Sequence, residues 1–183
     1  KLNESKGKQA VLEKLEPHIT GDIVIIHDAD WIFFYNSKKD LKQFFKLFDS
    51  PKLGGISDGF DYEMSHPRIK KIRSLAFLAS AWGNHFMLEY IKDNYAIRIN
   101  KNIRIYNKNK IKFYPMLDIY RKSALEKTQH KKELRAGDHA ERTLRIFNAG
   151  YDIITVDNKD WPRYTVSYNS LSVKDLINQT ENL

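Results

Sequence analysis

The chain has no cysteine among its 183 residues and no long apolar run. The lack of cysteine excludes disulfides and metal sites built on thiolates, and it fits a reducing compartment. No stretch approaches the roughly 18 to 20 apolar residues that a membrane-spanning helix needs, and residues 1–4 do not resemble a signal peptide. We therefore expect a cytoplasmic protein, with association at a membrane surface left open.

Several common catalytic motifs are also absent. The sequence contains no Walker loop, no His-Glu-x-x-His and no Gly-x-Ser-x-Gly, and it shows no internal repeat. With 42% hydrophobic and 13% aromatic residues, the chain is long enough for one substantial core, so we expect a single domain over residues 1–183. Because the sequence starts without a methionine, we expect a fragment or a processed chain.

Positive charge is concentrated in the middle of the chain. The formal net charge is +8, yet residues 66–135 alone carry 17 Lys and Arg against 5 Asp and Glu, a net of +12. A basic middle of this kind can attract a phospholipid surface, a lipid phosphate, a polyanionic sugar or a nucleic acid. A well-solvated lysine-rich surface explains the same composition equally well.

An apolar run followed by two carboxylates stands out near the N-terminus. Residues 23–26 are Ile-Val-Ile-Ile, which predicts an interior strand of a parallel sheet. Asp28 and Asp30 follow, and ligands of open α/β sheets bind at the carboxyl ends of the strands. Two hard oxygen ligands there suit Mg²⁺ or Mn²⁺ and, through the ion, a diphosphate. An acidic turn after a core strand is the simpler alternative.

Hydrophobic periodicity predicts the remaining elements, and together they indicate an α/β fold with a mostly parallel sheet flanked by helices. A helix from Asp138 would have Ala140, Leu144 and Phe147 on its apolar face and end at Gly150. The other predictions are helices over residues 39–48 and 67–91, strands over 54–57 and 151–156, a small antiparallel meander over 95–113, and a loop over 125–136.

The order of these parts resembles the inverting glycosyltransferases of family 2, which have the GT-A fold. The matching segments cover nearly the whole chain: Lys6-Gly7-Lys8 before a helix, the strand with Asp28-Ala29-Asp30, Gly54-Gly55-Ile56-Ser57, Arg121-Lys122-Ser123-Ala124-Leu125, and Gly137-Asp138 opening a helix that ends in Ala149-Gly150-Tyr151.

The resemblance implies a role for each matching residue. Asp30 and Asp28 would bind the divalent cation, Mg²⁺ or Mn²⁺, and Lys8 would join them at the nucleotide-sugar donor. Asp138 would be the general base that takes a proton from the acceptor hydroxyl. The implied acceptor is a saccharide or a lipid-linked molecule, with Arg121, Arg142 and His139 on its side of the site. We expect no nucleic-acid partner, and contact with an anionic membrane is left open.

The sequence departs from the family pattern in three places. Members of the family begin with strands that hold the nucleotide base, and nothing before Lys1 supplies them. Gly137 stands where the family usually has a Glu. The Gln-x-x-Arg-Trp element of processive members keeps only Gln179. The resemblance therefore implies a partial GT-A-like domain without processive synthesis.

Two other classes of protein remain open. In a phosphohydrolase of the haloacid-dehalogenase type, Asp28 would be a nucleophile and Asp30 an acid or base. However, those enzymes usually follow the pair with x-Thr or x-Val, whereas Trp31-Ile32 follows here. A non-catalytic basic binding module is supported by charge alone.

Overall fold

The chain forms an α/β fold in which a six-stranded mixed sheet is flanked by helices. The structure is a computed structural model, and it describes residues 11–12, 14–26, 31–58, 86–87, 89–112, 118–127, 138–157 and 162–166. The elements are η1 (Glu16–His18), β1 (Ile23–Ile25), β2 (Trp31–Phe34), α2 (Lys38–Phe45), η2 (Lys46–Asp49), β3 (Leu53–Asp58), β4 (Ala96–Asn100), β5 (Ile103–Tyr106), β6 (Ile119–Arg121), α4 (Lys122–Glu126), α5 (Asp138–Asn148), β7 (Asp152–Val156) and β8 (Arg163–Val166). Residues 86–87 and 89–95 are also helical.

The strand order of the main sheet is β1-β6-β3-β7-β5-β4. Only the β3–β7 pairing is parallel, and the other four described pairings are antiparallel. The prediction of a mostly parallel sheet is therefore wrong. Periodicity reports that a strand is buried, but it does not report the direction of the neighbouring strand.

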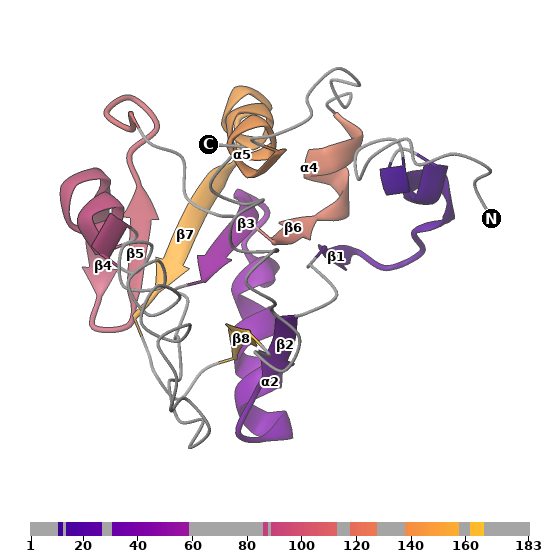
Figure 1. The fold of residues 1–183 in the computed structure, drawn as a ribbon, viewed down its shortest axis with the longest axis horizontal. Helices are drawn as coiled ribbons and strands as arrows, with labels where there is room; N and C mark the ends of the chain where they lie inside the picture. The colour runs from indigo at the N-terminus through magenta and orange to yellow at the C-terminus, as the bar shows by residue number, and fades with distance from the viewer. Residues whose placement is uncertain are drawn as a thin grey trace, which may run out of the picture.

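The sheet lies between two helical layers (Figure 1). Helices α4 and α5 cover one face, where Tyr120 and Ile153 belong to one core cluster. Helix α2 and the β2–β8 ribbon lie on the other face, where Ile119 and Ile154 belong to a second cluster. Because successive side chains of a strand point to opposite faces, β6 and β7 each contribute to both clusters.

Strand β1 does not occupy the interior position that its sequence predicts. It is a terminal strand of the described sheet, and its one partner there is the antiparallel strand β6. Ile25 is accordingly exposed, whereas Val24 is buried against the α4–α5 layer. The β-branched run thus specifies a strand, but burial on both of its faces is incomplete.

The predicted meander also differs from the structure. Residues 96–106 form one hairpin, β4–β5, and β5 pairs with β7, so the hairpin extends the main sheet instead of projecting from it. Residues 111–112 are not in a strand. The predicted loop over residues 125–136 begins too early, because Leu125 and Glu126 belong to α4, and residues 128–136 lie outside the described chain.

Helix α2 follows the predicted amphipathic pattern. Ser37 caps it by accepting a hydrogen bond from the Asp40 amide at 3.1 Å. Phe44 and Phe48 are buried, and the last turn, η2, is a 3₁₀ helix. None of the helices in the described ranges has the length and apolar content needed to cross a bilayer.

Helix α5 begins and ends where the sequence predicts, at Asp138 and before Gly150, which has a φ of +87°. The face of α5 that is buried differs from the predicted apolar face. Leu144 is exposed, while Thr143, Ile146 and Phe147 are buried. The prediction was based on the spacing of Ala140, Leu144 and Phe147. In the structure, the buried face of the helix instead includes polar and charged side chains.

Gly54 lets α5 and the start of β7 approach β3 closely. A Cβ atom placed on Gly54 would lie 2.5 Å from the Tyr151 Cβ and 2.6 Å from the Ile146 Cγ2. Both atoms are close to their own backbones, so neither can move away without a shift of the backbone. The register of β3 against β7 also shifts at this residue.

We expect Gly54→Ala to destabilise the fold by about 1–3 kcal/mol, because the added methyl group overpacks this contact. Gly21→Ala is a matched control, since a Cβ there would meet only the Ile23 carbonyl oxygen at 3.5 Å. Urea unfolding followed by circular dichroism measures both. Equal midpoints for the two variants would show that the β3–α5 contact is not tight.

Candidate functional site

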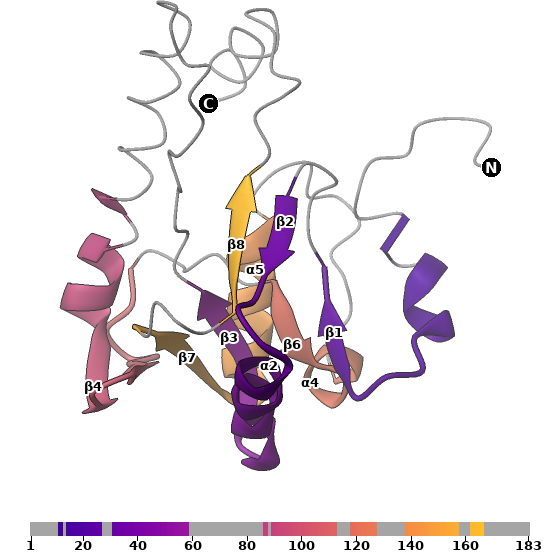
Figure 2. The ribbon, with the colours of Figure 1, turned by 90° about the horizontal axis from the view of Figure 1, so that it is seen from below.

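The carboxyl ends of three strands share one edge of the main sheet. Strands β3 and β7 are parallel, and β1 runs in the same direction because both β1 and β3 are antiparallel to β6. Figure 2 shows β2 and β8 beyond this edge, in the direction in which β1, β3 and β7 run. We call this the carboxyl edge. It is where open α/β sheets bind ligands.

The residues predicted to bind the donor all lie outside the described part of the chain. Asp28 and Asp30 lie between β1 and β2, and they are outside the described residues, as are Lys8 and His27. The end of β1 is fixed at this edge by a 2.9 Å hydrogen bond from the Ile26 amide to the Asp118 carbonyl. The described segment that contains β1 therefore ends at this edge, at Ile26, two residues before Asp28 in the sequence.

The first residue of α5 lies at the same edge. A tight turn at Gly150 joins α5 to β7, and the Tyr151 amide donates to the Ile146 carbonyl at 3.1 Å. Helix α5 packs on β7, and because the chain reverses at this turn we infer that the helix begins, at residues 138–139, toward the end of β7. The side chains of these two residues are outside the description.

A group of buried charged side chains lies between α5 and the sheet. Arg142 is fully buried, and its guanidinium carbon lies 5.5 Å from the centre of the Tyr120 ring. Asp118, two residues before Tyr120 and thus on the same face, is 2% exposed. The sequence predicted Arg142 for the acceptor side, and the structure places it beneath the first turns of α5 instead of at the surface.

Glu141 and Arg145 extend this group along α5. The Arg145 Nη1 lies 3.4 Å from the Glu141 Oε2, and the Arg145 Nη2 lies 3.4 Å from the Leu125 carbonyl on α4. Both side chains are largely buried. The buried charged group therefore contains two acids and two arginines, and it links α5 to α4 and β6. Buried ionisable groups at a ligand-binding edge are candidates for functional residues.

Arg121 lies at the opposite edge of the sheet. It pairs with Ile23 at the start of β1, and its guanidinium donates to the carbonyls of Leu53 at 2.8 Å, Ser50 at 2.7 Å and Phe48. These contacts hold the η2–β3 connection. The structure thus separates Arg121 from the carboxyl edge, whereas it brings Asp138, His139 and Arg142 toward it.

Sequence reasoning missed three buried hydroxyl groups near the carboxyl edge. Ser57 on β3 and Thr155 on β7 are paired in register and fully buried, and Tyr106 on β5 is 4% exposed. Burial raises the pKa of Tyr106 above its ordinary value, and the neighbouring hydroxyls of Ser57 and Thr155 oppose this rise. The strand alternation alone could have placed Ser57 and Thr155 on one face, but not Tyr106 beside them.

The described residues do not form a metal site by themselves. No group of three or more His, Asp or Glu side chains within the described ranges is arranged to hold an ion. Asp157 follows β7 near the edge, but it is engaged by the Arg104 Nε at 2.6 Å and the Arg98 Nη2 at 3.4 Å. The predicted ligands Asp28 and Asp30 fall in the segment between β1 and β2 that is not described.

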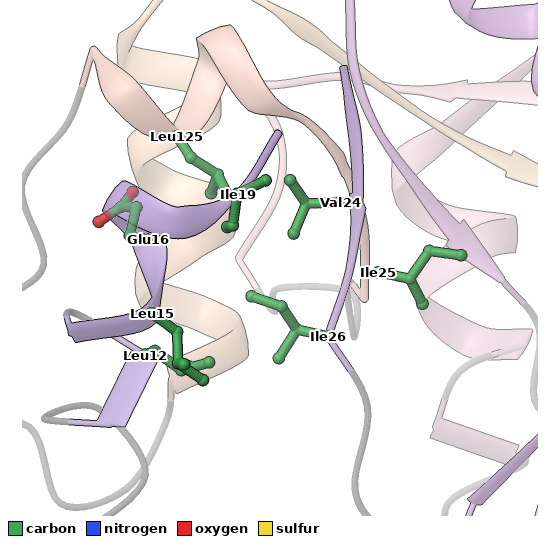
Figure 3. A pocket seen from close by; sticks show the side chains of 8 residues that line it. All are labelled: Leu12, Leu15, Glu16, Ile19, Val24, Ile25, Ile26 and Leu125. Atoms are coloured by element: carbon green, nitrogen blue, oxygen red, sulfur yellow. The ribbon is translucent and has the colours of Figure 1, made fainter. Parts of the chain in front are cut away.

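A cavity of about 330 Å³ lies between β1, α4 and the N-terminal helical residues (Figure 3). Val24 and Ile26 point into it from β1, facing Ile19, while Ile25 points to the other side of the strand. Among the described residues that line it, Glu16 is the one charged side chain, and the others are Leu, Ile and Val. This lining offers little to recognise a diphosphate, so we do not place the donor there.

Comparisons with models of protein families, with curated proteins and with solved structures find no match for this chain.

The raised pKa of Tyr106 gives a pH-dependent prediction. Folding favours the neutral phenol of Tyr106. Above the ordinary tyrosine pKa of about 10, the unfolded chain loses this proton and the folded chain does not, so the free energy of unfolding falls as the pH rises further. We expect Tyr106→Phe to lose less stability than the parent between about pH 10 and pH 11. Urea midpoints across this range test it, with Tyr35→Phe, an exposed tyrosine, as the control. Parallel curves for Tyr106→Phe and the parent would contradict it.

Proposed function

We propose that the chain is part of an inverting glycosyltransferase of the GT-A type, which transfers a sugar from a nucleotide-sugar donor to an acceptor hydroxyl or a lipid phosphate. The observation that carries the proposal is that β1 ends, and α5 begins, toward the carboxyl edge. In the sequence, the segment with Asp28 and Asp30 follows β1, and Asp138 is the first residue of the segment that forms α5. These segments are about 110 residues apart in the sequence.

The two acidic segments serve different steps in this proposal. Asp28 and Asp30 would hold Mg²⁺ or Mn²⁺, because paired carboxylates are suitable ligands, and such an ion neutralises charge on a leaving nucleoside diphosphate. Asp138 accepts the proton of the acceptor hydroxyl while that oxygen attacks the anomeric carbon. Attack from the face opposite the leaving group gives inversion in one displacement.

The buried charged group supports the position of the general base. Glu141, Arg142 and Arg145 connect the first turns of α5 with Tyr120 and α4. A catalytic carboxylate must be held within hydrogen-bond distance of the acceptor, so its helix has to be rigid. We therefore assign Arg142 to positioning α5, since its burial leaves no surface for contact with the acceptor.

We expect Asp138→Asn to slow sugar transfer at least about a hundredfold, since loss of a general base typically costs 10²- to 10⁴-fold. Asn begins a helix about as well as Asp, so the melting temperature and donor binding should not change. Turnover with a panel of nucleotide sugars measures the rate. The same substitution in the first turn of α2, Asp40→Asn, is the control and should retain parental turnover. Near-parental turnover for Asp138→Asn would place the base elsewhere, with Asp118 or Glu141 next to test.

In a chain that includes any residues encoded before Lys1, we expect binding of a nucleoside diphosphate in the presence of Mn²⁺, and we expect Asp30→Ala to abolish it, because the substitution removes a ligand of the ion. Calorimetric titration measures the affinity, and Asp49→Ala, an exposed acid in η2, should bind like the parent. Equal affinity in Asp30→Ala and the parent would remove Asp30 from the site. Hydrolysis of an aryl phosphate with Mg²⁺ that is lost in Asp28→Asn would instead support the phosphohydrolase alternative.

A further inference from the structure

Strand β4, a terminal strand of the sheet within the described residues, exposes apolar side chains that do not belong to either core cluster. Ile97 and Ile99 are 58% and 57% exposed, and the register of β4 against β5 shifts between Arg98 and Asn100, so Ile99 has no partner on β5. The helical residues just before β4 add Met87 and Tyr90, each 52% exposed. Isolated exposed apolar residues are common, but two isoleucines that are both more than half exposed on one short strand, with Met87 and Tyr90 just before it, indicate an interaction surface.

Positive charge flanks these isoleucines at both ends of the hairpin. Residues 96–112 contain six Lys and Arg and no Asp or Glu. Lys101 is in the turn between β4 and β5. The second turn, at residues 107–110, is held near the start of β4 by a 2.8 Å hydrogen bond from the Asn107 amide to the Tyr95 carbonyl. Lys108 and Lys110 lie in this turn, and Lys112 follows it.

The lysines and the arginines of the hairpin differ in their ion pairs. Arg104 pairs with Asp93 and Asp157, and Arg98 pairs with Asp157, so acids from outside the hairpin neutralise both arginines. Lys101, Lys108, Lys110 and Lys112 are exposed, and no ion pair with a carboxylate is formed by them within the described chain. Their charge is therefore available to an external anion.

We propose that the β4–β5 hairpin is a docking surface for an anionic phospholipid bilayer. Ile97 and Ile99 enter the boundary between headgroups and acyl chains, and the four lysines contact lipid phosphates and carboxylates. Binding at a bilayer surface combines buried apolar area with attraction to anionic lipids, and the hairpin supplies both. A surface for single-stranded nucleic acid would instead combine lysines with aromatic side chains for base stacking. The exposed apolar side chains of β4 itself are isoleucines, and the exposed aromatic residues Phe86 and Tyr90 lie before the strand.

This surface is independent of the glycosyltransferase proposal, since it lies at the end of the sheet farthest from β1 (Figures 1 and 2). Vesicle sedimentation therefore tests it without any assay of sugar transfer. The parent should sediment with vesicles of phosphatidylcholine and phosphatidylserine, and it should stay in solution with vesicles of phosphatidylcholine alone. Failure to bind the anionic vesicles would overturn the proposal.

Two sets of variants separate the apolar and ionic contributions. Ile97→Thr with Ile99→Thr keeps β-branched residues in the strand, and it should weaken vesicle binding about tenfold or more because apolar area is lost. Lys108→Gln with Lys110→Gln should weaken binding about fivefold for each lysine removed. The same apolar change at the other end of the sheet, Ile25→Thr, is the matched control and should bind like the parent.

The outcomes are distinguishable. Loss of binding in both hairpin variants, with circular dichroism spectra like that of the parent, supports docking through this surface. Unchanged binding in the isoleucine variant overturns it, because the membrane contact is then elsewhere or purely ionic. Binding of single-stranded RNA that is lost in the lysine variant and retained in the isoleucine variant would assign the surface to nucleic acid.

Discussion

The placement of β6 between β1 and β3 is the constraint on which the rest of the structure depends. Ile119 and Tyr120 are both fully buried, one in each core cluster, so this short strand joins the two layers of the fold. The Ile26 amide binds the Asp118 carbonyl at one end of the β1–β6 pair, and the Lys122 amide binds the Asp22 carbonyl at the other, at 2.9 and 2.8 Å. Because β6 is antiparallel to both neighbours, β1 and β3 must end at the same edge.

Local patterns predicted the elements better than their arrangement. The helix from Asp138 to Gly150 was predicted because an apolar period, a favourable first residue and a C-terminal glycine all agree within a short segment. The antiparallel position of β6 was not predicted, because strand direction depends on partners that are distant in sequence. For the same reason β1 was predicted as an interior strand, although β6 is its one partner in the described sheet.

The candidate site shows the same limit. Sequence order predicts Asp28, Asp30 and Asp138 as site residues, and this stays a prediction; the described topology shows that β1, which precedes the first two, ends at the carboxyl edge. Sequence order did not predict that Arg121 and Arg142 have different surroundings. Both are arginines in motifs that resemble the family, yet Arg121 binds carbonyls at the far edge and Arg142 is buried against Tyr120. Burial of a charged side chain depends on the packing of α5 on the sheet, which no local pattern encodes.

The proposed glycosyltransferase site and the proposed membrane-docking surface are compatible, because the sheet is wide enough to separate them. Strands β1 and β4 are its two terminal strands with four others between them, so they are separated by about 24 Å at the usual interstrand spacing. A bilayer in contact with β4 and its lysines would thus be distant from the carboxyl end of β1. The acids that pair with Arg98 and Arg104 confine the available positive charge to the lysines at the ends of the hairpin. In the proposed arrangement, attraction to anionic lipid would therefore act at the β4 end of the described sheet, opposite the end at which β1 lies.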